Sequence, residues 1–138
     1  MSSLCQGRLV WTLVADPRGK NPKHRPVVIL TSNKELKTAK VAVGVVASHS
    51  AASVVPLPDH HIALPYQQNG LCTSKLRKPT VAICDWLAEV PNEPVSRDNL
   101  GGVITPMLLA KILEKIKEME STRLAPSSQT NRPSEPNP

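Results

Sequence analysis

The chain has 138 residues, enough for one compact domain with a sizeable core, and its formal net charge is +6. Residues 1–40 supply that whole excess, because they contain eight Lys and Arg but only two acidic residues. This concentration of charge favours a surface that binds a polyanion such as nucleic acid, and a solvated basic surface is the alternative. No apolar run approaches the ~20 residues that span a bilayer, and the three cysteines have no metal-ligand spacing. We therefore expect a soluble, cytoplasmic protein with reduced thiols and no membrane partner.

Three strands are predicted in the first part of the chain. They cover residues 7–14 (GRLVWTLV), 25–31 (RPVVILT) and 40–47 (KVAVGVVA), which are rich in apolar and β-branched residues. The Pro and Gly of DPRGKNPK force a turn between the first two, and this turn is densely basic. Gly44 in the third strand indicates a bend or a bulge.

Two more strands and one helix are predicted further along. A short extended piece covers residues 61–64, and TVAICDWL forms a strand over 80–87. Alternation along that strand puts one set of side chains on one face and another set on the other, namely Val81, Ile83 and Asp85 against Ala82, Cys84 and Trp86. Thr105 as N-cap and Pro106 as first residue open a helix with an apolar stripe. This order predicts a small curled sheet or partly closed barrel packed against a C-terminal helix.

We expect one domain over residues 1–120, with the folded part beginning near residue 4, and a disordered Pro/Ser-rich tail over 121–138. Nucleotide hydrolysis, dinucleotide binding, zinc proteolysis and esterase activity have no motif here. His60 and His61 lack a third ligand nearby in the sequence, so no metal site is expected. Aromatic residues are scarce, which favours recognition of nucleic acid by charge, hydrogen bonds and shape over stacking.

Four segments occur in a recognisable order over about residues 6–118. They are GRLVWTLVADPRGKNPKHRPVVILTS, VAVGVVASHS, LCTSKLRKPTVAICDWLAEV and LGGVITPMLLAKILEKI. This order resembles the MazF/PemK family of toxin–antitoxin ribonucleases, whose members share a G-x-hydrophobic-W strand, an Asp-Pro-x-x-Gly loop and an Arg-Pro entry to an apolar strand. The resemblance implies an SH3-like β-barrel that forms a homodimer and cleaves single-stranded RNA without metal or other cofactor. It also implies neutralisation by a cognate antitoxin.

The resemblance also implies site residues. Arg25 matches the catalytic Arg of the Arg-Pro motif, and Ser48 falls where MazF-type members carry a catalytic Thr. Asp85 matches the acidic residue of PemK-type members, although Ile83 stands where those members have a second Arg. In the implied reaction the RNA 2′-hydroxyl attacks phosphorus and leaves a 2′,3′-cyclic phosphate, while Arg25 stabilises the phosphorane and Ser48 donates to a phosphate oxygen.

The general base has three candidates in the sequence. His24 precedes Arg25 but would point to the opposite face of the strand, His49 follows Ser48, and Asp85 can accept a proton. The expected RNA-binding residues are Arg18, Lys20, Lys23 and His24. Two other functions stay open: a non-catalytic toxin of this fold that binds a protein such as DNA gyrase, and a basic nucleic-acid-binding module.

Overall fold

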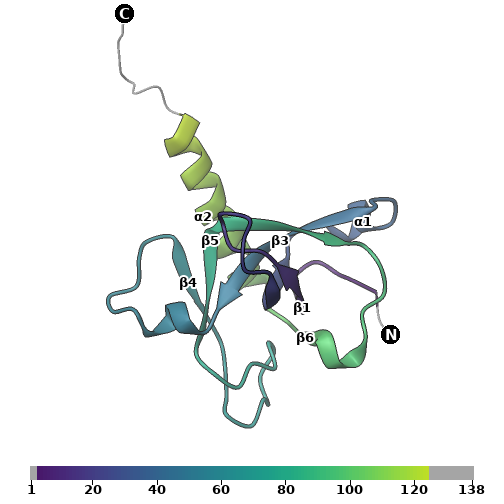
Figure 1. The fold of residues 1–138 in the computed structure, drawn as a ribbon, viewed down its shortest axis with the longest axis horizontal. Helices are drawn as coiled ribbons and strands as arrows, with labels where there is room; N and C mark the ends of the chain where they lie inside the picture. Colours follow the sequence, from purple (N-terminus) through teal and green to yellow (C-terminus); the bar gives the residue numbers. More distant parts are fainter. Residues whose placement is uncertain (1–2, 125–138) are drawn as a thin grey trace, which may run out of the picture.

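A computed structural model of the chain describes residues 3–124. Its strands form one antiparallel sheet in the order β4-β5-β3-β2-β1-β6, which curls into a half-barrel (Figure 1). The elements are β1 (Arg8–Val14), β2 (Lys23–Ile29), α1 (Asn33–Leu36), β3 (Val41–Ser48), η1 (Ser50–Ser53), β4 (His61–Leu64), β5 (Thr80–Pro91), η2 (Arg97–Asn99), β6 (Leu100–Val103) and α2 (Pro106–Leu124). The predicted fold class, mainly β with a C-terminal helix, is confirmed.

Both faces of the sheet are covered, which explains why its central strands read as apolar runs. Leu9 and Val28 belong to a first core that Ile112 of α2 completes, and all three side chains are fully buried. Val10 and Val27, their neighbours in β1 and β2, belong to a second core on the opposite face. Successive strand residues point to opposite faces, so each strand contributes to both cores.

A bulge in β5 changes which side chains share a face. Val45 of β3 lies opposite Leu87, and Ala47 lies opposite Ala82, so two steps along β3 match five steps along β5. The extra residues reverse the alternation. Ala82 therefore packs in the first core, while Trp86 packs against the second. The prediction that Trp86 shares a face with Ala82 is wrong because it assumed an unbroken strand.

Gly44 in β3 is needed for close approach between strands. A Cβ added there would lie 2.8 Å from the Val28 carbonyl oxygen of β2. The predicted irregularity is present, but it lies just beyond Gly44, between Val45 and Ala47. The glycine itself allows β2 and β3 to pack tightly at the centre of the sheet.

Helix α2 begins as predicted. The backbone N–H of Leu108 donates to Thr105 Oγ1 at 3.2 Å, which is an N-cap interaction. Its later turns extend away from the sheet (Figure 1), and it ends at Leu124, inside the segment expected to be a tail. The remaining tail lies outside the described residues. Among those that are described, no helix has the length and apolar character that a membrane span requires.

Candidate functional site

The basic loop between β1 and β2 is organised by Asp16. Its Oδ1 accepts from the backbone N–H groups of Arg18 (3.0 Å) and Lys20 (2.8 Å), and its Oδ2 accepts from Asn21 Nδ2 (3.1 Å). These bonds, that from Lys20 above all, lower the pKa of Asp16 below its usual value. The carboxylate therefore fixes the turn of the loop through these hydrogen bonds, and the side chains of Arg18 and Lys20 lie exposed. Lys23 is exposed as well.

Arg25 is held in place by three contacts at the start of β2. Its Nε donates to the Val14 carbonyl at 3.1 Å, and its Nη2 donates to the Asn21 carbonyl at 3.3 Å. The guanidinium carbon lies 4.9 Å from the centre of the Trp86 ring, a cation–π contact. No acidic side chain in the described part of the chain forms an ion pair with Arg25. The guanidinium is thus fixed without being neutralised, and its remaining N–H donors are available to an anion.

The sheet register brings Ser48 to the same rim as Arg25. Val27 of β2 lies opposite Val46 of β3 in an antiparallel pair. Continuing this register by two residues puts Arg25 across from Ser48, on the same face of the sheet. Ser48 is partly buried, and its Oγ lies 3.0 Å from Ser50 Oγ. The observed β2–β3 pairing ends at Val27 and Val46, and its regular continuation directs the Arg25 guanidinium and the Ser48 hydroxyl to one face of the rim where β2 begins and β3 ends.

Asp85 lies elsewhere. Its Oδ1 is 3.5 Å from His60 Nε2, in a small cavity of about 160 Å³ that α2 helps to line. Its neighbour Trp86 is the residue that contacts Arg25. The structure therefore places Arg25 and Ser48 at one rim of the sheet and gives Asp85 a different partner.

The histidine pair His60 and His61 lies beside Asp85. The rings of His60 and His61 are T-shaped, 4.4 Å apart between centroids. Burial, with a smaller effect of His60, lowers the pKa of His61. Within residues 3–124 no group of three or more His, Cys, Asp or Glu side chains is arranged to hold a metal ion.

Of the two histidines proposed as bases, His49 is the better oriented. Its Nδ1 lies 2.6 Å from the Pro79 carbonyl oxygen. In the neutral ring Nδ1–H donates to this carbonyl, which leaves Nε2 as the basic nitrogen. His24 is exposed in β2, one residue before Arg25 and on the opposite side of the strand.

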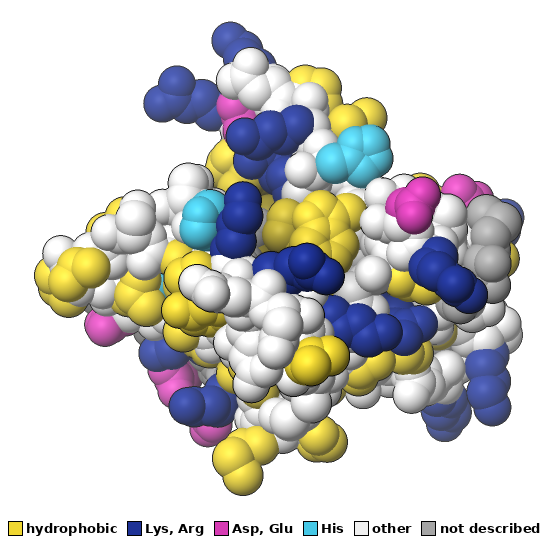
Figure 2. Space-filling view, turned by 90° about the horizontal axis from the view of Figure 1, so that it is seen from below, with side chains coloured by type: hydrophobic (Ala, Val, Ile, Leu, Met, Phe, Trp, Pro, Cys, Tyr) yellow, Lys and Arg dark blue, Asp and Glu magenta, His cyan; other side chains and the backbone are white. Residues whose placement is uncertain are grey.

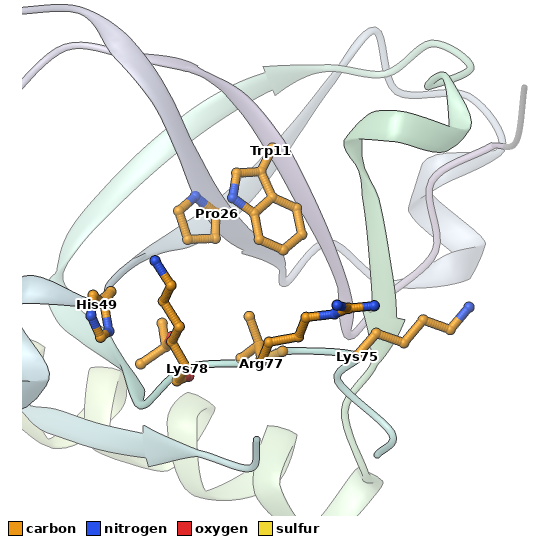
Figure 3. Close-up of a pocket in the computed structure, with 8 residues that line it drawn as sticks. Trp11, Pro26, His49, Lys75, Arg77 and Lys78 are labelled. Carbon is orange, nitrogen blue, oxygen red and sulfur yellow. The ribbon is translucent and has the colours of Figure 1, made fainter. Parts of the chain in front are cut away.

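A cleft of about 410 Å³ opens on the other face of this rim (Figure 3). It is lined by Trp11, Pro26, His49, Lys75, Leu76, Arg77, Lys78 and Thr80. Figure 2 shows one face of the molecule on which several Lys and Arg side chains surround a hydrophobic patch. The three basic residues of the cleft were not among the expected binding residues, because they lie where the total charge is balanced. Their sequence signal is the alternation of basic with apolar or small residues in SKLRK.

Comparison with known proteins places the fold. No protein-family model matches the sequence, and no curated protein matches it. The structure is similar to a MazF from Deinococcus radiodurans, with a TM-score of 0.62 at 13% identity over 88% of this chain and 99% of that one. It is also similar to the Mycobacterium tuberculosis toxin MazF-mt6, with a TM-score of 0.59 at 17% identity over 83% and 96% of the two chains.

A third similar structure is a chain of a MazE–MazF crystal structure from Deinococcus radiodurans, with a TM-score of 0.57 at 15% identity over 87% of this chain and 97% of that one. At identities this low the likeness establishes the fold. The chain therefore has the fold of MazF toxins, as the sequence resemblance implied.

Proposed function

We propose that this protein is a MazF-like toxin that cleaves single-stranded RNA at the rim where β2 begins and β3 ends. One observation supports this most directly: in a MazF-like fold, the antiparallel register of β2 and β3, continued past the Val27–Val46 pair, directs Arg25 and Ser48 to the same face of that rim. The anchoring of Arg25 to two backbone carbonyls and to Trp86 suits the binding of a crowded phosphate. The exposed basic loop beside it adds an attractive field for a polyanion.

In the proposed reaction the RNA 2′-oxygen attacks the adjacent phosphorus and the 5′-oxygen leaves, which gives a 2′,3′-cyclic phosphate. The free N–H groups of Arg25 bind the phosphorane oxygens, and the Ser48 hydroxyl donates to another of them. His49 Nε2 is our candidate to accept the 2′-hydroxyl proton, because Nδ1 is already engaged by Pro79. The guanidinium supplies the positive charge, so this step uses no metal ion.

We also propose a cognate antitoxin and a homodimer as assembly partners. Solved structures similar to this chain include MazE–MazF crystals and a mycobacterial endoribonuclease in complex with its cognate antitoxin. An antitoxin that covers the Arg25 rim would block the substrate. In this proposal the toxin acts on cellular RNA in the cytoplasm.

The test is incubation of the purified chain with mixed-sequence single-stranded RNA in EDTA. Wild type should leave cyclic-phosphate ends at defined sites, and Arg25→Ala should lose at least about 10²-fold in rate. Arg97→Ala is the matched control, because Arg97 is an exposed arginine of η2, and it should cut like wild type. Circular dichroism checks that each variant is folded.

The ribonuclease proposal fails if folded wild type leaves the RNA intact, or if Arg25→Ala cuts as fast as the control. Inhibition of gyrase supercoiling would then support the protein-binding alternative. Binding of intact RNA that weakens steeply with salt would support the passive nucleic-acid-binding module.

A further inference from the structure

The segment that carries the basic residues of the cleft is firmly anchored. Ser74 and Leu76 are buried, whereas Lys75, Arg77 and Lys78 are exposed. The Ser74 carbonyl accepts from the backbone N–H of Gly102 in β6 at 2.9 Å, and the Ser74 hydroxyl donates to a carbonyl of the preceding loop. These contacts fix the backbone of the segment, so its basic side chains project from a fixed position.

The opposite wall of the cleft is an aromatic ring with a fixed orientation. Trp11 of β1 lies opposite Pro26 of β2, and both line the cleft. The ring is partly buried and packs against the first core. A Cβ added at Gly101 of β6 would lie 3.0 Å from Trp11 Cζ3, so β6 supports one edge of the ring. A ring held in this way is suited to stack on a nucleic-acid base at little ordering cost.

The charges of the cleft are not neutralised by the protein. In Figure 3 Arg77 and Lys78 extend into the space below Trp11 and Pro26, and Lys75 extends away along the edge. No acidic residue lines the cleft, and within residues 3–121, where side chains are described, neither Arg77 nor Lys78 forms an ion pair. Two unpaired cations opposite an aromatic ring match the phosphates and the base of a nucleotide.

The cleft adjoins the candidate site along the chain. Pro26 follows Arg25 in β2, and His49 follows Ser48 at the end of β3. Arg25 and Pro26 are successive residues of β2 and face opposite sides of the sheet, so the two sites lie on either side of one rim. His49 lies in the turn just beyond the end of β3, so it belongs to the rim between the two sites. A strand whose phosphate contacts Arg25 would enter the cleft as it crosses the rim.

We propose that this cleft binds one unstacked nucleotide of single-stranded RNA next to the scissile phosphate, with its base on Trp11 and its phosphates on Arg77 and Lys78. That the bound nucleic acid is an RNA that the protein cleaves rests on the proposed function. The volume of about 410 Å³ accommodates a single nucleotide. A duplex keeps its bases stacked inside the helix and cannot place one on the ring.

The experiment measures binding of the full chain to a fluorescent single-stranded RNA whose 2′-hydroxyls are replaced by fluorine, so that it cannot be cut. Arg77→Gln/Lys78→Gln should weaken binding at least about tenfold at 0.1 M salt, and should reduce the slope of log K against log salt by about 1.4, which is 0.7 for each of two phosphates. Lys34→Gln/Lys37→Gln, in α1 and at its C-cap, removes the same charge from exposed positions elsewhere and should stay within about threefold.

A second pair of variants tests the aromatic wall. Trp11→Leu should weaken binding about tenfold, and Trp11→Phe should retain most of the affinity, because only the second keeps a ring on which a base can stack. Thermal melting confirms that both variants fold. A duplex of the same sequence should bind more weakly than the single strand to wild type and should not respond to Trp11→Leu.

The proposal is overturned if the Arg77/Lys78 variant binds like its α1 control, or if the duplex binds as tightly as the single strand. Since the probe cannot be cut, these outcomes do not depend on catalysis. If natural RNA stays intact with wild type while the Arg77/Lys78 variant loses binding to the fluorinated strand, the ribonuclease proposal fails and the cleft stands as a nucleotide-binding site.

Discussion

Gly102→Ala should destabilise the protein and disturb the cleft at the same time. In β6 the backbone of Gly102 lies directly against the segment that carries the basic residues. A Cβ added there would overlap the Thr73 carbonyl oxygen and would lie 2.8 Å from Thr73 C and 2.9 Å from Ser74 C. Carbon atoms in contact are normally about 3.5–4.0 Å apart. Since all of these atoms belong to backbone, the segment has to move away by about 1 Å.

The expected cost follows from two effects. Overpacking of this kind costs about 1–3 kcal/mol, and the displaced segment loses the hydrogen bond from Gly102 N–H to the Ser74 carbonyl, which contributes about 0.5–1.5 kcal/mol. We therefore expect a loss of about 2–4 kcal/mol in the free energy of unfolding. For a domain of this size that corresponds to a decrease in Tm of roughly 8–15 °C.

Urea unfolding followed by circular dichroism measures this loss, and binding to the fluorinated RNA measures the state of the cleft. Gly19→Ala is the control, because a Cβ at Gly19 meets no atom within 4 Å, although its φ of +79° disfavours alanine; it should cost about 1 kcal/mol. A Gly102→Ala protein that is as stable as this control and binds the RNA with wild-type affinity would refute the reasoning.

Three further predictions concern titratable groups. Iodoacetamide at pH 8 should modify Cys72 before Cys84, because the hydrogen bond with Ser74 lowers the pKa of Cys72 and burial raises the pKa of Cys84 to about 11. Peptide mass spectrometry measures the order of modification, and the reverse order would contradict these environments. The lowered pKa of His61 means that the unfolded chain binds more protons, so stability should fall as pH drops through the unfolded value of 6.5, and His61→Gln should flatten this slope in urea titrations. The lowered pKa of Asp16 stabilises the fold at pH values above the unfolded pKa of 3.8, and this stabilisation is lost as pH falls through the folded pKa. Asp16→Asn should therefore reduce the slope of the free energy of unfolding against pH in acid. An unchanged slope would exclude the hydrogen bonds of Asp16 as its cause.

Much of the fold could be predicted from short stretches of the sequence. Apolar runs of β-branched residues predicted most of the sheet, and the Thr105 cap predicted where α2 begins. Strand β6 escaped prediction because four residues with two glycines have little β-propensity. Helix α1 also escaped, although Ser32 and Glu35 form the capping pair that could have revealed it: Glu35 N–H donates to Ser32 Oγ at 3.2 Å.

The candidate site was predictable in part. The family resemblance implied Arg25 and Ser48, from the Arg-Pro strand entry and the end of an apolar strand, and the antiparallel pairing of β2 with β3 puts both at one rim. Trp86 as the ring beneath Arg25 was not predictable, because alternation assumes an unbroken strand and the bulge in β5 reverses it. The scarcity of aromatic residues also argued against stacking, whereas the proposed nucleotide site needs only one ring, that of Trp11.

The sequence alone determined most of the strands, the start of α2 and the positive charge of the β1–β2 loop, because these depend on neighbouring residues. Only the tertiary structure decided that Asp85 pairs with His60 and that Arg77 and Lys78 face Trp11. Those pairings join segments far apart in the chain, and they depend on a bulge and on the close approach at Gly102. The local sequence pattern does not specify such contacts, because they form only when distant segments come together in the folded sheet.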